Sequence, residues 1–313
     1  PAYGTRRQSP LMARTTPLPD GAAARDRIRA IALMLTALVL FAGLDATAKY
    51  LVTREGLGVA QVAWLRFLGQ ITYMVAIYLV VRMPALVATA QPKAQFVRST
   101  LMLGTTGFNF LALKYLRLDQ TITIVFLTPL VVAALAGPLL GEWVGWRRWL
   151  AILVGFSGIV VAMRPGFANV HPAVLWSLAS MLCYAGFMLI TRRIAGNDPP
   201  FVTLFWSMLV GAVGLAPFAL SEWVQPQSAF AVLLLMALGA LGGTGHFLFI
   251  HAYRLAPASS IAPFLYFQLI AMVALGWLVF ADVPDLWTLL GASIVTASGI
   301  YLFHRERVTR GGG

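Results

Sequence analysis

Residues 109–118 read NFLALKYLRL and residues 246–255 read HFLFIHAYRL, with Phe-Leu near the start and Arg-Leu at the end. These pairs recur at a constant offset of 137 residues. Further matches pair Trp146 and Ser157-Gly158-Ile159 with Trp287 and Ser298-Gly299-Ile300 at an offset of 141, and Phe41-Ala42-Gly43 with Tyr184-Ala185-Gly186 at an offset of 143. The second half of the chain therefore repeats the first.

The composition indicates a membrane protein. Of 313 residues, 59% are hydrophobic and 11% are charged, and mean hydropathy is +0.81. Soluble domains carry about 25% charged residues, and a helix needs about 20 apolar residues to cross a bilayer. We predict an all-α fold of ten transmembrane helices at 28–49, 59–81, 96–114, 119–139, 146–163, 172–191, 200–220, 230–252, 257–280 and 286–303. The remaining residues leave no room for a separate soluble domain.

Each repeat contains five of these spans, and an odd number forces the two halves to lie inverted in the bilayer. The boundaries that follow are a basic cytoplasmic tail without regular structure at 1–27, a first five-helix repeat at 28–164, a second at 165–305 and a cytoplasmic tail at 306–313. Inverted repeats are characteristic of secondary transporters, in which the substrate site lies near the midplane between the halves. The repeat therefore predicts a transporter.

The net charge of +12 follows membrane topology. With the amino terminus inside, 17 Lys and Arg residues fall on the inner side and five on the outer side, while Arg66 lies within the second span. Cytoplasmic loops retain positive charge, so we predict that both termini are cytoplasmic. Because membrane topology explains the positive charge, the charge does not indicate nucleic-acid binding. The basic tail contacts anionic lipid at most.

Three residues inside the first two spans, Asp45, Lys49 and Arg66, are charged and lie away from the predicted inner end. Asp45 and Lys49 are spaced i, i+4 on one helix face, and Arg66 enters from the same side. Intramembrane charges are costly and mark functional sites by default. One interpretation is a structural ion network near the outer interface, with Lys49 reaching water. The other is a site for an amino or carboxylate group, which is favoured for Asp45 because its repeat counterpart is the uncharged Met188.

Polar residues in later spans extend this candidate site. Asn109 and His246 are equivalent in the repeat, so we expect both to border a central cavity, although an interhelical hydrogen bond would also explain them. Tyr184, Tyr266 and Gln268 complete the candidate substrate-binding set. His246 and His251 are five residues apart and face different directions. The pattern predicts no metal site, no cofactor and no catalytic residue.

Two prolines interrupt equivalent spans. Pro129 lies in the fourth span and Pro263 in the ninth, and a proline inside a helix removes a backbone hydrogen bond and kinks the helix. Interrupted helices at corresponding positions point to a transport site. We predict conformational hinges at both prolines, and a tolerated kink without function is the alternative.

One motif suggests an enzyme. Gly155-Phe156-Ser157-Gly158 matches the G-x-S-G pattern of rhomboid intramembrane serine proteases, in which a histidine on a later span activates the serine. Its Ser-Gly pair recurs in the second repeat as Ser298-Gly299, which favours a duplicated contact between helices over a nucleophile. Proteolysis stays a minor alternative.

Several strings resemble the drug/metabolite transporter superfamily in its ten-helix bacterial form with paired EamA domains. They are Gly43-Leu44-Asp45-Ala46 with Lys49, Gly141-Glu142, Trp149, Gly155-Phe156-Ser157-Gly158, Ala256-Pro257-Ala258-Ser259 and Phe280-Ala281-Asp282-Val283-Pro284. The resemblance covers residues 28–305. Asp282 stands where the family pattern has glutamate, so no role is transferred to it.

The resemblance implies a multi-pass protein of the bacterial inner membrane, working by alternating access around a central cavity. Among members of the superfamily, the chain looks most like exporters of amino acids, including aromatic ones. An amino-acid zwitterion also suits a site in which Asp45 lies beside cations. Efflux of drugs or organic cations by the same fold is the alternative. Exchange of organic phosphates would call for clustered cations. A non-transporting scaffold also stays open, and no oligomeric state is predicted.

Overall fold

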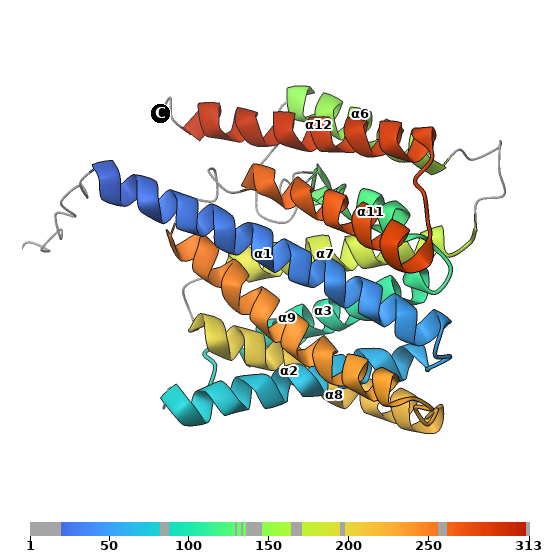
Figure 1. Ribbon diagram of the computed structural model, residues 1–313. Coiled ribbons are helices and arrows are strands. Elements are labelled where there is room, and N and C mark those ends of the chain that lie inside the picture. Colours follow the sequence, from blue (N-terminus) through green and yellow to red (C-terminus); the bar gives the residue numbers. More distant parts are fainter. Residues whose placement is uncertain are drawn as a thin grey trace, which may run out of the picture.

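The computed structural model describes residues 20–81, 88–128, 130–132, 134–135, 146–163, 171–194, 198–255 and 262–310. Within these ranges the regular structure is helical throughout (Figure 1). The first half contains α1 (Asp20–Thr53), α2 (Val59–Val81), α3 (Pro92–Leu113), α4 (Leu118–Val125) and α6 (Trp146–Met163). The second half contains α7 (Val174–Ile194), α8 (Pro200–Ser221), α9 (Ala229–Leu255), the 3-10 helix η1 (Ala262–Tyr266) with α11 (Phe267–Phe280), and α12 (Leu286–Arg310).

Most predicted spans match an observed helix, whereas α4 ends at Val125 within the fourth predicted span and α11 begins only at Phe267 within the ninth. Both α2 and α6 have the predicted bounds. Four helical stretches are long and apolar enough to cross a membrane, namely Arg25–Thr53, Val174–Thr191, Phe201–Ser221 and Ala229–Ala252. Shorter apolar stretches lie in α4, α6, α11 and α12. The protein is therefore an all-α membrane protein.

Helical structure continues into both regions predicted as terminal tails. Helix α1 already begins at Asp20, within the tail predicted at 1–27, and α12 continues to Arg310, within the tail predicted at 306–313. Residues 21–25, GAAAR, favour helix because alanine and arginine are strong helix formers, so the first span extends outward as a continuous helix. Residues 1–19 and 311–313 lie outside the described part of the chain.

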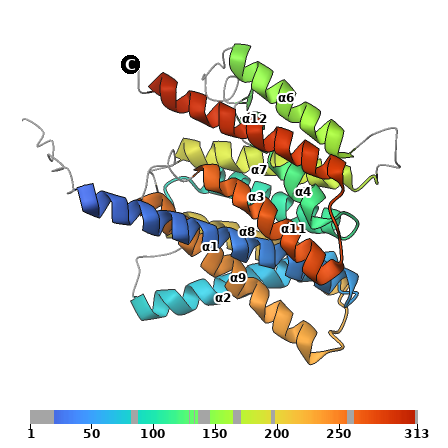
Figure 2. The same ribbon diagram turned by 45° about the horizontal axis from the view of Figure 1, so that its top comes forward.

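The helix contacts follow the predicted repeat. The contact of α1 with α9 is the counterpart of the contact of α7 with α3, and the contact of α2 with α9 is the counterpart of α8 with α3. In three further contacts, a helix packs against its own equivalent in the other repeat, namely α2 with α8, α4 with α11 and α6 with α12. Such a pattern is expected of two similar halves related by a pseudo-twofold axis. In Figures 1 and 2, α6 and α12 lie together at one edge, away from α2 and α8.

Two helix crossings depend on glycine. A Cβ atom added to Gly69 of α2 would lie 2.9 Å from the Cα atom of Gly239 of α9, so these two backbones touch. At the crossing of α6 with α12, a Cβ atom on Gly158 would lie 2.8 Å from the carbonyl oxygen of Gly291. Small residues permit this approach between membrane helices. The repeated Ser-Gly pairs thus contribute to helix packing, since Ser298 also donates a hydrogen bond to the Ala151 carbonyl.

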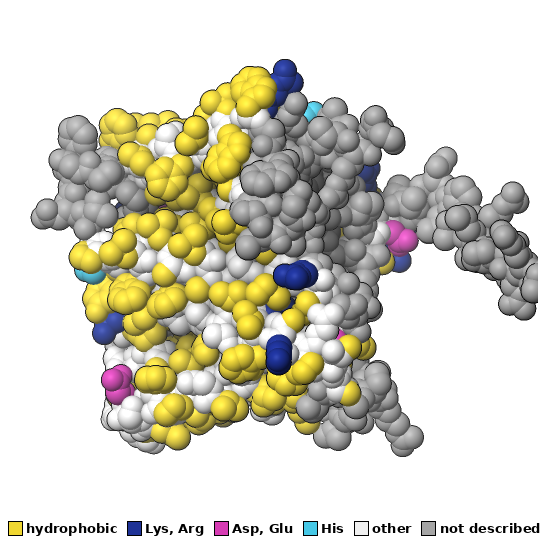
Figure 3. Space-filling view, turned by 180° about the vertical axis from the view of Figure 1, so that it is seen from behind, with side chains coloured by type: hydrophobic (Ala, Val, Ile, Leu, Met, Phe, Trp, Pro, Cys, Tyr) yellow, Lys and Arg dark blue, Asp and Glu magenta, His cyan; other side chains and the backbone are white. Residues whose placement is uncertain are grey.

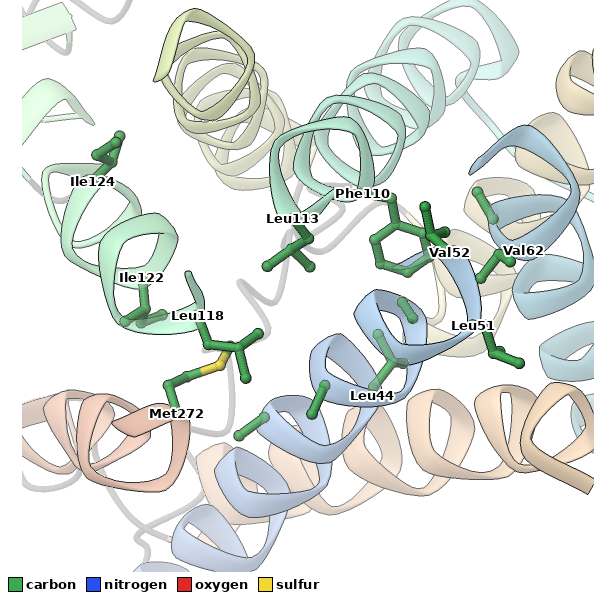
Figure 4. Packing of buried hydrophobic residues seen from close by; sticks show 14 of the residues in the cluster. Leu44, Leu51, Val52, Val62, Phe110, Leu113, Leu118, Ile122, Ile124 and Met272 are labelled. Atoms are coloured by element: carbon green, nitrogen blue, oxygen red, sulfur yellow. The ribbon is translucent and has the colours of Figure 1, made fainter. Parts of the chain in front are cut away.

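The main apolar core joins the two halves. Leu44 and Leu51 of α1, Phe110 of α3 and Leu118 of α4 belong to one cluster of buried residues together with Met272 of α11. Figure 4 shows Leu118 and Met272 meeting between α4 and α11, and Phe110 directed toward α1. This packing fixes the walls around which the polar residues of the site are arranged.

The outer surface is largely apolar. Exposed hydrophobic side chains occur along α6, α8, α9, α11 and α12, among them Leu153, Val213, Met236, Leu278 and Leu290. Figure 3 shows hydrophobic side chains spread over much of the described face seen from behind. Such a surface suits contact with lipid.

Both predicted helix interruptions concern segments that break regular helix. Helix α4 ends at Val125, a turn follows at Phe126 and Leu127, and the chain is helical again at Thr128. Pro129 itself lies outside the described residues. A residue at 129 with an N–H would bond the Val125 carbonyl in a regular helix, and the Thr128 hydroxyl donates to that carbonyl instead, at 2.6 Å. Pro263 lies in η1, so the ninth span begins as a 3-10 segment before α11.

Candidate functional site

A central cavity of about 170 Å³ lies between the two halves. Helices α1, α2, α3, α4, α7, α9 and α11 contribute its walls. Its polar lining residues are Asp45, Arg66, Thr105, Thr106, Asn109, Thr121, Ser180, Tyr184, His246 and Gln268. Six of the eight residues predicted as substrate-binding are therefore gathered around one cavity. Their role in binding stays a prediction.

Two opposite charges in this cavity have unused hydrogen-bonding capacity. Asn109 Nδ2 donates to Asp45 Oδ1 at 3.1 Å, and Arg66 Nη1 donates to Thr106 Oγ1 at 2.5 Å. Arg66 is 5% exposed, and its Nε atom has no hydrogen-bond partner among the described residues. A buried polar atom without a partner destabilises the fold, so the unused Arg66 Nε atom makes this pair a candidate for substrate contact.

The wall of the cavity is set by packing between α1 and α9. The ring of Phe41 lies 4.9 Å from the His246 ring, centroid to centroid. Gly245 permits this contact, because a Cβ atom there would lie 2.7 Å from the Phe41 ring. Asn109 and His246 both line the cavity, as their equivalence in the repeat predicts.

Lys49 does not join Asp45 and Arg66, and the expected cluster of three charges is wrong in this respect. Its Nζ atom pairs with Asp282 Oδ2 at 3.0 Å and lies 4.6 Å from the centre of the Phe280 ring. Asp282 follows the end of α11, where Ala281 adopts a left-handed backbone with φ 57°. Lys49 is one helical turn beyond Asp45 and reaches α11 rather than the cavity, which its own position in the sequence does not reveal.

Tyr266 also lies outside the lining of the central cavity. Its ring packs edge-on against Phe126, with centroids 4.9 Å apart, and it contributes to the apolar core. The contact joins η1 to the turn after α4. Tyr266 therefore links the two interrupted segments, one from each repeat.

A second cavity, of about 350 Å³, adjoins the first, and we call it the Arg98 cavity. Both cavities are lined by Met102, Tyr184 and His246. The Arg98 cavity extends from these residues toward Ile194 and Asp198, where α7 ends and α8 begins. The sequence prediction places that connection on the cytoplasmic side.

Arg98 is the functional candidate that sequence reasoning missed. As an arginine at the inner end of the predicted third span, it is one of the 17 inner-side charges, yet it is 2% exposed and lines the Arg98 cavity. Its Nε atom donates to Thr191 at 2.7 Å, and its Nη1 atom donates to the Thr203 carbonyl at 2.9 Å and to Ser207 at 2.8 Å. These partners lie on two helices of the other half, so no local pattern around residue 98 indicates them.

Asp198 closes the far end of the Arg98 cavity without pairing with Arg98. Its carboxylate accepts hydrogen bonds from Thr89 at 2.5 Å, from the Ala90 backbone at 2.9 Å and from Gln95 at 2.9 Å. Burial raises the pKa of the Asp198 carboxyl, but these hydrogen bonds outweigh burial and lower its pKa below the ordinary value. Asp198 thus joins the start of α3 to the start of α8.

The arrangement offers little to the enzymatic alternative. Ser157 lies on the exposed side of α6, and its hydroxyl donates to the Val154 carbonyl at 2.7 Å rather than to a histidine. Nucleophilic catalysis requires a base within hydrogen-bond reach of the nucleophile. In the part of the chain that the structure describes, no group of three or more His, Cys, Asp or Glu residues is placed to hold a metal ion.

Comparison with known proteins gives a family match in both halves. The model of the EamA-like transporter family matches residues 28–164 and residues 171–304. A crystal structure aligned over 91% of this chain and 99% of its own has a TM-score of 0.62 at 18% sequence identity, which supports the fold.

The curated relatives are named for different small molecules. An S-adenosylmethionine uptake transporter of Rickettsia prowazekii is 27% identical over 286 residues, or 91% of this chain and 96% of the relative. A riboflavin transporter of Vibrio cholerae is 29% identical and aligns over 87% of this chain and 92% of its own. The pseudopaline exporter CntI of Pseudomonas aeruginosa is 21% identical, over 63% of this chain and 70% of its own.

Proposed function

The chain belongs to the EamA-like transporter family, which makes it a multi-pass membrane transporter of small metabolites, and we propose that its substrates carry an α-amino-acid head group. The observation that supports this proposal is the presence of Asp45 and Arg66 in the lining of one cavity. An ammonium group suits the Asp45 carboxylate and a carboxylate suits the Arg66 guanidinium. Asn109, His246 and Gln268 supply further polar contacts around them.

This combination of charges disfavours the competing substrates. An organic cation without a carboxylate would bring positive charge near Arg66, and an organic phosphate would bring negative charge near Asp45. Like charges brought together in a desolvated site oppose binding, so each charge acts against one competitor. The bacterial relative named for S-adenosylmethionine transport is compatible with the proposal, because that compound contains an amino-acid head group.

Alternating access would proceed through the interrupted segments. The turn after α4 and the 3-10 segment η1 meet through Phe126 and Tyr266, and α4 and α11 contact each other across the pseudo-twofold axis. We propose that these segments, with the predicted hinges Pro129 and Pro263, reorganise as access changes sides. The Arg98 cavity provides loading from the predicted cytoplasmic side, which is the first step of the export that the sequence predicts.

A counterflow assay with purified protein in liposomes would test the head-group proposal. The internal solute would be leucine, and the competitors would be leucine, its decarboxylated analogue 3-methylbutylamine and its deaminated analogue 4-methylpentanoate. Glycerol phosphate, S-adenosylmethionine and tryptophan would extend the series. We expect exchange only with compounds that carry both the amino and the carboxylate group. Equal exchange of the amine would instead assign organic-cation efflux, and preferred exchange of glycerol phosphate would assign phosphate transport.

A further inference from the structure

Arg98 has no carboxylate partner in the part of the chain that the structure describes, and its guanidinium lies over the Phe187 ring, 4.4 Å from the ring centre. Among the described residues no carboxylate forms an ion pair with it, and the Asp198 carboxylate is engaged by Thr89, Ala90 and Gln95. Its Nη2 atom makes no hydrogen bond to the described part of the chain, although Nε and Nη1 make three. A buried cation normally has a partner of opposite charge.

A second polar group in the same cavity also lacks a partner. Gln70 of α2 is 2% exposed and lines the Arg98 cavity, and its Nε2 atom is buried without a hydrogen-bond partner among the described residues. Both Gln70 Nε2 and Arg98 Nη2 are donors and not acceptors. Gln70 Nε2 packs against α9 at Gly242, so the main attraction for a ligand is the Arg98 guanidinium, which favours an anion over a cation.

The size of the joined cavities indicates a substrate longer than a simple amino acid. The central cavity, about 170 Å³, is smaller than the roughly 300–1,000 Å³ of typical ligand sites. With the adjoining 350 Å³ of the Arg98 cavity, the space falls within that range. Phe67 and Phe249 line the second cavity and suit an apolar section of a substrate, while Phe187 lies under the Arg98 guanidinium at the polar end.

The repeat supports a task for Arg98 beyond packing. At the offset of 137 residues that relates the third and eighth spans, Arg98 corresponds to Leu235, which is buried in the apolar core. The equivalent position of the fold is therefore filled by a hydrocarbon side chain. The arginine must supply something that the symmetric architecture does not require.

We propose that the Arg98 cavity is a second subsite, which binds an anionic group at the far end of an elongated substrate. This inference rests on the proposed function. The amino-acid head group lies at Asp45 and Arg66, and a distal carboxylate lies at Arg98 and Gln70. The substrate class is thus an α-amino acid with an acidic group on an extended side chain. A planar guanidinium with free N–H donors binds a carboxylate in this way.

The test compares amino acids that differ only in the distal acid. Counterflow competition would use the α-amino dicarboxylates 2-aminoadipate, 2-aminopimelate and 2-aminosuberate, each against the α-amino monocarboxylate of the same chain length. In the parent protein we expect one dicarboxylate to compete about tenfold to a hundredfold better than its partner, as a charge-assisted hydrogen bond provides. Arg98→Gln should remove that advantage and leave the affinity for the monocarboxylates unchanged.

Matched controls separate binding from structure. Arg193→Gln removes an exposed arginine of α7 near the same end of the molecule, and it should preserve the dicarboxylate advantage. If Arg98→Gln fails to give monodisperse protein, Gln70→Ala should still reduce the advantage, by about twofold to tenfold. Equal affinity of dicarboxylates and monocarboxylates in the parent, or an equal loss for both in a folded Arg98→Gln protein, overturns the proposal.

The compound suberate, which has the two acids but no amino group, distinguishes this proposal from the head-group proposal. Competition by suberate that depends on Arg98, together with no binding of the amino monocarboxylates, would retain the subsite and refute the head group. Binding of the monocarboxylates without any dependence on Arg98 would do the reverse.

Discussion

Asp45 carries the charge on which the proposed head-group recognition depends. Asp45→Asn keeps the size of the side chain and its ability to accept from Asn109, but it removes the negative charge that an ammonium group would meet. We expect apparent affinity for amino acids to fall about tenfold to a hundredfold, measured by counterflow, with folded protein recovered in parental yield. Asp26→Asn near the start of the same helix is the control and should leave affinity unchanged. Parental affinity in Asp45→Asn would refute a contact with the substrate.

Asp198 should make stability depend on pH. Because hydrogen bonds hold its folded pKa below the ordinary value, the stabilisation is complete above the unfolded pKa of about 3.9 and is lost as the pH falls through the folded pKa. Asp198→Asn should therefore unfold at a lower temperature than the parent at pH 7. The difference should shrink as the pH is lowered below about 4. A thermal unfolding series of both proteins in detergent measures it, and a constant difference at every pH would contradict the assignment.

Individual residues also show what the sequence can indicate. Asp45, Arg66 and His246 could be predicted to lie together because polar groups inside apolar spans tend to face a shared cavity, and all three line the central cavity. Lys49 was misplaced because its partner, Asp282, lies 233 positions away along the chain. Arg98 was overlooked because an arginine near the cytoplasmic end of a span is normally explained by topology.

At the scale of helices, the pair of Lys49 and Asp282 joins α1 to the end of α11 on the predicted outer side. A partly exposed ion pair is worth about 1 kcal/mol at most, so removing it should change an equilibrium between closed and open states by up to about fivefold. We expect Asp282→Asn to increase labelling of a Val125→Cys cavity cysteine from that side, in a background without Cys183. Exchanging the charges, Lys49→Asp with Asp282→Lys, should restore parental labelling. Unchanged labelling in Asp282→Asn would assign the pair to packing alone.

Helix positions were predictable from hydropathy because apolar length and helix length are physically linked. Which helices pack against each other was less predictable from the sequence. The contact between the Gly69 and Gly239 backbones depends on two glycines in different repeats, and no periodicity within α2 or α9 identifies the partner. The break after α4 could be expected from Pro129, but the actual turn at Phe126 and Leu127 precedes it.

For the whole molecule, the orientation in the membrane can be tested directly. Figure 1 shows the start of α1 and the end of α12 on the same side of the molecule. The charge distribution predicts that this side faces the cytoplasm. Ser221 is exposed at the end of α8, and Ala90 is exposed just before the start of α3. The prediction places Ser221 outside and Ala90 inside. After replacement of Cys183, an impermeant thiol reagent added to intact cells should label Ser221→Cys and spare Ala90→Cys, and equal labelling would contradict the orientation.

The pseudo-twofold pattern of helix contacts also bears on the energetic balance of the transport cycle. If the halves were identical, exchanging their conformations would convert a state open to one side into an equally stable state open to the other. Any resting preference must then arise from residues that the duplication does not share, such as Asp45 opposite Met188 and Arg98 opposite Leu235. Because those same positions hold the proposed substrate contacts, evolution of a new cargo and adjustment of the resting state would be coupled through a few unduplicated side chains.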